Sequence, residues 1–386
     1  MKKLRLALSP LLLGLASCGA SPVGESAAKP TPAAAPFTVT EVARFKEPWA
    51  IAFLPGTPYA LVTEQAGKLK LWEEGGEVVD VLGVPPVAYG GQGGLGDVVL
   101  APDFASTGAI YLSWAETDDL GSGSGAGADT RGAVVAKARL DLEHFAPRLA
   151  DLQVIWRQTP KVTGRGHYSH RMAFSPDGKY LFVASGERQK FTPAQDMAQN
   201  LGKIVRLLPD GTPAPGNPFA AQGGIAAQVW TLGHRNILGI KFDAQGRLWE
   251  TEHGPAGGDE IDLVEPGKNY GWPLVSEGDH YDGRDIPPHA SRPDLAAPAV
   301  SWNPVIGPGD FIFYRGDKFP AWRGQAIIAG LVSQGLVRVA IDGAKAREVA
   351  RYPLGQRIRA IAEREDGTIW LLEDDPGGRL LKLTPK

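Results

Sequence analysis

The sequence contains almost no cysteine. Its 386 residues include a single one, Cys18, which excludes an internal disulfide framework and a metal cluster held by several thiolates. An excess of one charge is also absent, because 40 basic residues face 43 acidic ones and the formal net charge is −3. Without a strongly basic field to hold phosphates, nucleic acid is not expected as a partner.

Long helix-forming stretches are missing too. The chain has 49 glycines and 32 prolines, and both residue types interrupt helices, which argues against a helical bundle. Apolar residues nevertheless make up 43% of the chain. This share is enough for a large core and excludes global disorder.

The first residues have the features of an export signal. A basic start precedes a short apolar run, Leu6 to Leu15, and then small residues; the run is too short for an ordinary membrane span. Cys18 stands where a bacterial lipoprotein carries its lipidated thiol, and plain secretion with loss of Cys18 is the alternative. We therefore predict a lipoprotein-type signal peptide at residues 1–18. The protein would be exported, periplasmic or at the cell surface, and would meet the membrane only through this lipid anchor.

Composition divides the remaining chain into a tether and a domain. Residues 19–36 are rich in Ala, Pro, Ser and Gly, a composition that cannot build a core and predicts a flexible tether. Residues 37–386 are expected to form the folded domain, which has no disulfide to stabilise it.

A β-hairpin pattern recurs along this domain. Each copy has a strand with alternating apolar residues, a tight turn and a second β-rich strand; in Met172–Ser185 the turn is Pro-Asp-Gly. The six copies start near residues 49, 97, 172, 240, 311 and 358. Since a four-stranded blade needs about 40–50 residues plus loops, we predict an all-β fold, a six-bladed β-propeller of four-stranded antiparallel blades. An irregular pair of β-sandwiches is the alternative.

The connectors between these copies are unusually rich in functional side chains. Loops of a propeller gather at one mouth of its central channel, so these connectors are expected to meet there. They are residues 164–171, 233–236, 252–260, 268–273 and 355–359.

Three kinds of chemistry can be read from these connectors. Arg357 and Arg359 alternate in a strand-like stretch and would share one face, where they could bind a carboxylate, or form a plain surface ion pair. Exposed carbonyls at Gly254-Pro255, with an acidic residue nearby, would suit calcium, or form an ordinary acidic loop. His167, in a glycine-flanked polar loop, is the leading candidate for a general base, or is a structural histidine.

Taken in this order, the connectors resemble the soluble PQQ-dependent aldose sugar dehydrogenases of the glucose/sorbosone dehydrogenase family. The resemblance runs from about Trp49 to Leu383 and implies a six-bladed propeller. The motifs that carry it are Gly91–Leu95, Gly233–Asn236, Glu252–Ile261, Lys268–Pro273 and Gly355–Arg359.

The resemblance also implies a role for individual residues. His167 corresponds to the catalytic base of the family, and Glu187 to an acidic residue beside that base. The residues implied to hold the quinone cofactor are Gln92, Arg235, Asn236, Tyr281, Arg357 and Arg359. The residues implied to bind calcium are Gly254 and Pro255 at the cofactor, through their carbonyls, and Glu260 with the Tyr270 carbonyl at a second site.

The sequence departs from the family pattern at two places. His170 stands where the family usually has a glycine after the base, so it adds bulk and a second titratable group. Val332 stands where the family has a lysine that approaches the cofactor. The second change removes a cation, so it is expected to weaken cofactor binding or to leave more of that binding to the arginines, rather than to alter the fold.

The predicted function is therefore PQQ- and calcium-dependent oxidation of an aldose sugar at its anomeric carbon, giving a lactone. His167 would abstract the hydroxyl proton while a hydride passes to the quinone. A non-catalytic binding propeller at the cell surface and a calcium-dependent propeller lactonase are the alternatives. The sequence identifies neither the preferred sugar nor the electron acceptor, and it leaves monomer and homodimer open.

Overall fold

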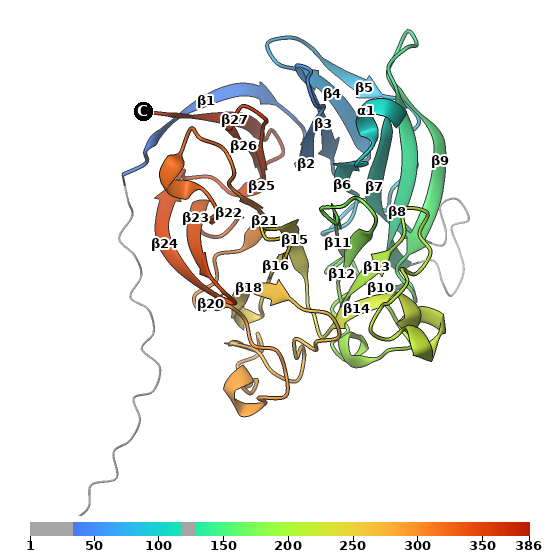
Figure 1. The fold of residues 1–386 in the computed structure, drawn as a ribbon, viewed down its shortest axis with the longest axis vertical. Coiled ribbons are helices and arrows are strands. Elements are labelled where there is room, and N and C mark those ends of the chain that lie inside the picture. The colour runs from blue at the N-terminus through green and yellow to red at the C-terminus, as the bar shows by residue number, and fades with distance from the viewer. Residues whose placement is uncertain (1–33, 118–128) are drawn as a thin grey trace, which may run out of the picture.

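The computed structural model describes residues 34–117 and 129–386 (Figure 1). The predicted signal peptide at 1–18 and most of the predicted tether at 19–36 lie outside these described residues. Within them, no helix is long and apolar enough to cross a membrane.

Six antiparallel sheets stand around a central axis (Figure 1). Their innermost strands are β2 (Pro48–Phe53), β6 (Leu95–Leu100), β11 (Ser169–Phe174), β15 (Ile237–Phe242), β21 (Pro308–Phe313) and β25 (Ile358–Glu363). Each innermost strand contacts that of the next blade, and β25 contacts β2, so the ring is closed. Each of the six predicted copies contributes one of these strands. The predicted six-bladed propeller is therefore confirmed.

Each blade adds further strands outward. The second strands are β3 (Tyr59–Glu64), β7 (Ala109–Thr117), β12 (Leu181–Ser185), β16 (Leu248–Glu252), β22 (Ala326–Gly330) and β26 (Ile369–Glu373). The third strands are β4 (Lys68–Glu73), β8 (Thr130–Asp141), β13 (Lys203–Leu207), β18 (Asp259–Val264), β23 (Gly335–Asp342) and β27 (Arg379–Pro385). The outer strands are β5 (Val78–Val81), β9 (Arg148–Arg157), β14 (Val229–Leu232), β20 (Val300–Trp302), β24 (Lys345–Pro353) and β1 (Phe37–Arg44).

A few short elements complete the described structure. Strand β10 (Val162–Thr163) pairs with β8, and β17 (Ala256–Gly257) pairs with β19 (Gly278–Asp279). The helical segments are α1 (Phe104–Thr107), η1 (Thr192–Gln195), η2 (Ala220–Gln222), η3 (Gly224–Gln228), η4 (His289–Ser291) and η5 (Pro320–Trp322).

The last blade joins the two ends of the domain. Strand β1 runs antiparallel to β27, with Phe37 opposite Pro385 and Arg44 opposite Arg379, and Figure 1 shows the two strands side by side. The N-terminal strand therefore completes a sheet whose other three strands come from the C-terminus.

The core lies between neighbouring blades. Successive residues of a strand point to opposite faces, so Leu61 of β3 packs in a cluster with β6 to β9, whereas Ala60 and Val62 pack with Trp72 and Trp370 on the side of the last blade. Because both faces of a blade are covered in this way, the middle strands are apolar on both faces.

All six innermost strands share an irregularity near their first residues. The pairing register shifts near the start of β2, β6, β11, β15, β21 and β25. Such bulges bend a strand and redirect its side chains. The predicted functional residues lie at or just before several of these bulges.

Candidate active site

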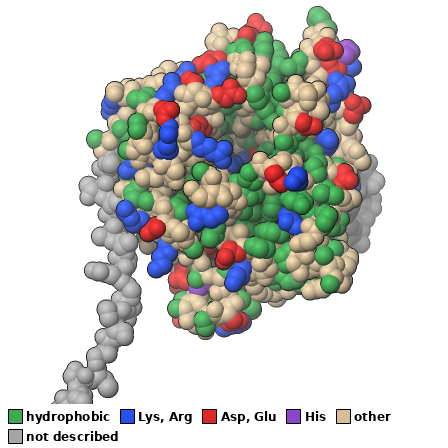
Figure 2. All heavy atoms as spheres, viewed as in Figure 1, with side chains coloured by type: hydrophobic (Ala, Val, Ile, Leu, Met, Phe, Trp, Pro, Cys, Tyr) green, Lys and Arg blue, Asp and Glu red, His purple; other side chains and the backbone are tan. Residues whose placement is uncertain are grey.

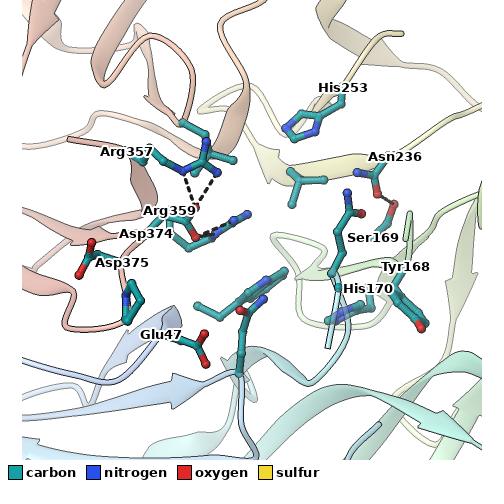
Figure 3. Close-up of a pocket in the computed structure, with 17 residues that line it drawn as sticks. Glu47, Tyr168, Ser169, His170, Asn236, His253, Arg357, Arg359, Asp374 and Asp375 are labelled. Carbon is teal, nitrogen blue, oxygen red and sulfur yellow. Dashed lines mark hydrogen bonds and ion pairs between the residues drawn. The ribbon is translucent and has the colours of Figure 1, made fainter. Parts of the chain in front are cut away.

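A cavity of about 370 Å³ lies where the innermost strands begin. It brings together four residues predicted to bind the cofactor, Gln92, Asn236, Arg357 and Arg359. Figure 3 shows Arg357 and Arg359 on one side of this space and Asn236 with Ser169 on the other. The face seen in Figure 2 is hollowed near the middle of the ring, with charged side chains around the hollow.

His167 and Glu187 form a buried pair beside this cavity. The Nδ1 atom of His167 is hydrogen-bonded to Oε1 of Glu187, and the backbone N–H of His167 donates to Oε1 of the cavity residue Gln92 at 2.7 Å. His167 has a left-handed backbone, with φ at 51°. The predicted base and its acidic partner are therefore brought together, and the base is tied to a predicted cofactor residue.

The Glu187 carboxylate is held by the turn that follows it. It accepts backbone N–H bonds from Gln189 at 2.9 Å, Lys190 at 2.5 Å and Phe191 at 2.6 Å. Burial alone would raise the pKa of Glu187, but the bonds from His167 and the backbone hold that pKa below its ordinary value. Glu187 is thus an acceptor, so Nδ1 of His167 carries the proton and Nε2 keeps its lone pair.

The pKa of His167 is itself lowered. Burial is the main cause, and the positive charges of Arg235 and Arg188 add to it, while Glu187 acts in the opposite direction. The imidazole is therefore neutral at neutral pH, which is the form that a general base requires.

Arg235 is buried, and its Nε atom has no hydrogen-bond partner. Its Nη1 donates to the His253 carbonyl at 2.8 Å and its Nη2 to the Tyr281 hydroxyl at 3.4 Å, whereas its Nε is buried with no partner. Unpaired buried donors are rare in native structures, so this side chain is suited to an acceptor that comes from a ligand. Tyr281 is 78% exposed at the edge of the site.

Arg357 and Arg359 share one carboxylate. Their Nε atoms donate to opposite oxygens of Asp374, at 2.8 Å and 2.9 Å (Figure 3). The predicted common face of the two arginines is present, and an internal ion pair holds both guanidinium groups at the cavity. Asp374 was not singled out from the sequence; its place just after the sixth repeated hairpin was the available signal.

His170 forms a wall of the cavity. Its ring stacks on Trp49 with centroids 5.1 Å apart, and its Nδ1 lies 2.8 Å from the Ser113 hydroxyl. Burial, followed by the charge of Arg171, lowers the pKa of His170 to about 3. The extra titratable group predicted at this position is therefore a neutral packing group. Sequence reasoning missed Trp49 as a cavity residue, because an apolar strand residue is more often core.

The Gly254-Pro255 turn is fixed in place. Asp259 accepts the Gly254 N–H at 3.0 Å, and its other oxygen accepts the backbone of Ile306 at 2.8 Å and of Gly307 at 2.6 Å. A Cβ on Gly254 would lie 2.2 Å from the Gly257 carbonyl, so only glycine fits. The turn directly follows His253, which lines the cavity, whereas Gly254 and Pro255 are not among the lining residues.

The residues of the second predicted calcium site lie in separate surroundings. Glu260 belongs to a buried trio with Glu252 and Asp262, in which one oxygen of each lies within 4.8 Å of the others. An all-oxygen set of this kind suits calcium. The Tyr270 carbonyl accepts a hydrogen bond from Nε2 of His289 at 3.0 Å, a contact that the sequence did not predict.

Val332, at the position where the family has a lysine, does not line the cavity. Its side chain is 53% exposed, and its neighbour Leu331 lines the cavity instead.

Comparison with known proteins identifies the family of this chain. The chain matches the glucose / sorbosone dehydrogenase family over residues 45–382. It is 38% identical over 365 residues to aldose sugar dehydrogenase YliI of Escherichia coli (strain K12), covering 92% of this chain and 95% of that protein.

Two solved structures have the same fold over nearly the whole domain. The apo-form of soluble aldose sugar dehydrogenase from Escherichia coli has a TM-score of 0.83 and 35% identity, covering 91% of this chain and 100% of that one. The PQQ-bound form of aldose sugar dehydrogenase from Streptomyces coelicolor has a TM-score of 0.71 and 27% identity, covering 92% and 100%. On these matches, with which its closed six-bladed ring agrees, the chain belongs to the glucose/sorbosone dehydrogenase family.

Proposed function

We propose that this protein oxidises aldose sugars at the anomeric carbon to lactones, using PQQ and calcium. Its relatives are named as sugar dehydrogenases, and one structural neighbour is PQQ-bound. The observation that carries the proposal is the buried His167–Glu187 pair next to a cavity lined by arginine and amide side chains.

The cavity residues fit a planar polyanion such as PQQ, which bears three carboxylates. Arg357 and Arg359 present guanidinium groups to the cavity. Arg235 is not among the lining residues, but its Nη1 donates to the carbonyl of the cavity residue His253 and its buried Nε has no partner. Gln92 and Asn236 add amide donors. The carbonyls of the Gly254-Pro255 turn are hard oxygen ligands for calcium. When bound, the quinone would supply hydride acceptance, with calcium as a Lewis acid.

The proton of the sugar goes to His167. With Nδ1 donating to Glu187, the free Nε2 takes the proton of the anomeric hydroxyl as the hydride leaves the anomeric carbon, which leaves a lactone. The ionised Glu187 stabilises the resulting imidazolium and keeps its orientation, as acidic residues do in catalytic triads. Three backbone N–H groups hold the Glu187 carboxylate in position. The carboxylate in turn orients the His167 imidazole.

The test is reconstitution. The protein is expressed without PQQ, supplied with PQQ and Ca²⁺, and assayed for dye reduction with a panel of aldoses. We expect saturable PQQ binding and sugar-dependent reduction. Absence of reduction with every aldose, together with absence of PQQ binding, would reject the proposal.

The same experiment separates the two alternative functions. A binding module would take up a sugar without reducing the dye at any PQQ concentration. A lactonase would hydrolyse lactones with Ca²⁺ alone. The unpaired buried donor of Arg235 favours a large anionic ligand over both.

We also propose that the protein is an exported lipoprotein anchored through Cys18. The N-terminal sequence pattern supports this. Cys18→Ser should move the protein from the membrane fraction to the soluble fraction of the exporting cell, and an unchanged distribution would contradict lipid attachment.

A further inference from the structure

Four carboxylates lie together inside the fourth blade. Strands β16 and β18 pair antiparallel, with Glu250 opposite Asp262 and Glu252 opposite Glu260. Residues two apart on a strand share a face, so all four side chains point to the same side of this sheet. All four are buried.

No basic side chain of the described residues forms an ion pair with these carboxylates, apart from a histidine. Nδ1 of His234 lies 3.4 Å from Oε1 of Glu250. When the carboxyl groups are ionised, both oxygens of Glu250, both oxygens of Asp262 and Nδ1 of His234 are buried without a hydrogen-bond partner. Glu250 and Asp262 can bond to each other only if one of them holds a proton. Burying a charge without compensation is strongly unfavourable, so the cluster lacks a positive partner.

His234 is oriented toward the cluster. Its Nε2 lies 2.9 Å from the Thr231 hydroxyl, and its ring stacks on Tyr270 with centroids 4.7 Å apart. These contacts fix the ring and leave Nδ1 facing Glu250. A separation of 3.4 Å is long for a hydrogen bond. It equals the separation of about 3.4 Å between two ligand atoms that lie about 2.0–2.1 Å from one tetrahedral ion.

We infer that His234, Glu250 and Glu252 bind a divalent transition-metal ion of the zinc class. Their ligand atoms all lie within 4.8 Å of one another. An imidazole nitrogen with two carboxylates suits zinc and related ions, whereas calcium takes oxygen ligands. The site shares Glu252 with the Glu252–Glu260–Asp262 trio described above, but its other two ligands, His234 and Glu250, belong to neither calcium position.

Protonation is the competing explanation for this cluster. Burial raises the pKa of Glu250, and the neighbouring Glu252 and Asp262 raise it further. Without an ion, Glu250 would therefore hold a proton more readily than an exposed glutamate does. A bound ion predicts that the protein takes up metal, whereas shared protons predict that it does not. A measurement of metal binding therefore separates the two explanations.

The proposed ion would be connected to the residues that are proposed to hold the cofactor. Oε2 of Glu252 accepts the backbone N–H of Arg235 at 2.7 Å and of Asn236 at 3.1 Å. Glu252 thus joins the proposed ion to the two residues proposed to hold PQQ, and His234 precedes them directly. This positioning role depends on the proposed function, but the metal site itself does not.

The test measures metal binding on the full chain without any sugar assay. Protein stripped with a chelator is titrated with Zn²⁺ by calorimetry and, separately, with Co²⁺, whose visible absorption reports a tetrahedral nitrogen and oxygen site. We expect Zn²⁺ uptake that raises the melting temperature, and a tetrahedral Co²⁺ spectrum. Uptake of Ca²⁺ without Zn²⁺ would overturn the choice of ion, and no uptake of either would overturn the site.

Two variants sharpen the result. Glu250→Gln keeps the shape but removes a charged ligand, so Zn²⁺ affinity should fall at least about tenfold. Thr251→Val is the matched control, because Thr251 lies between the two glutamates on the opposite face of β16 and its hydroxyl has no partner; it should bind Zn²⁺ as the wild type does. His234→Gln is the second variant if Glu250→Gln does not fold. Unchanged Zn²⁺ affinity in a folded ligand variant would overturn the proposal.

Discussion

At the scale of single residues, the site depends on which atom holds a proton. Glu187 accepts three backbone N–H bonds as well as the bond from His167. It is therefore ionised, and the imidazole has one defined tautomer. The sequence predicted the two residues but not this arrangement. The N–H donors of Gln189, Lys190 and Phe191 depend on a turn in which Arg188, Gln189 and Phe191 have positive φ values of 62°, 59° and 63°. No residue propensity indicates such a turn.

The pH dependence of turnover should follow His167. The base works in its neutral form, and burial lowers its pKa from 6.5, so kcat/KM should be level near pH 7 and fall only below pH 6.5. Glu187→Gln removes the carboxylate that raises this pKa, and should shift the acidic limb to lower pH while lowering the plateau. PQQ-loaded protein assayed across pH measures both effects. A fall in kcat/KM that begins above pH 6.5 in the wild type, or an acidic limb at the same pH in Glu187→Gln, would contradict the assignment.

Substitution of His167 tests the base directly. His167→Gln should lose about 10²–10⁴-fold in kcat and keep its melting temperature and PQQ affinity, because the base does not hold the cofactor. The control is His144→Gln, at a histidine whose side chain is 54% exposed and bound to Asp141, which should turn over normally. Near-normal turnover of His167→Gln would remove His167 from the mechanism.

Gly96 shows how closely the cavity wall is packed. A Cβ at this position would lie 1.8 Å from Cε1 of His170, and that ring is already held between Trp49 and Ser113. Gly96→Ala should therefore destabilise the protein by about 1–3 kcal/mol, measured by denaturant unfolding. Gly377→Ala, where the nearest atom is 3.8 Å away, should be close to neutral. Equal stability of the two variants would show that the cavity wall rearranges to accept the added methyl group.

At the scale of elements, local patterns predicted more than distant pairings. The six hairpins were predictable because Asp-Gly turns and alternating apolar residues are local signals. The pairing of β1 with β27 joins residues more than 300 positions apart, and nothing in either strand specifies its partner. The acid cluster was missed for the same reason: Glu250 and Asp262 become neighbours only through the register of β16 with β18.

The closing strand should contribute strongly to stability. Phe37 at the start of β1 is buried and packs edge-on against Phe319, Trp322 and Tyr352. Phe37→Ala should cost about 3–5 kcal/mol, again by denaturant unfolding. Val39→Ala on the same strand removes a side chain that is 43% exposed and should change stability by no more than about 0.5 kcal/mol. A small effect of Phe37→Ala would mean that the blade is closed by backbone pairing alone.

At the scale of the whole molecule, ligand binding should stabilise the closed ring. The cavity is lined by residues before and within β2, β11, β15 and β25, so a bound polyanion contacts several blades at once. PQQ with Ca²⁺ at about 100 times its Kd should add about 2.7 kcal/mol, seen as a higher melting temperature. Arg235→Ala should shrink this shift. No shift at saturating PQQ would contradict the proposed cavity.

The bulges at the starts of the six innermost strands have a consequence for how the site can change. Each blade presents its own short irregular segment, and these segments contact one another. The His167 N–H donates to Gln92, and the His170 ring lies against Ser113 and Trp49 of other blades. The fold therefore separates a repetitive scaffold from a set of coupled positions, so a change in one segment has to be matched by its neighbours. His170 of β11 illustrates this coupling, because its ring fits only where Gly96 of the neighbouring blade carries no side chain.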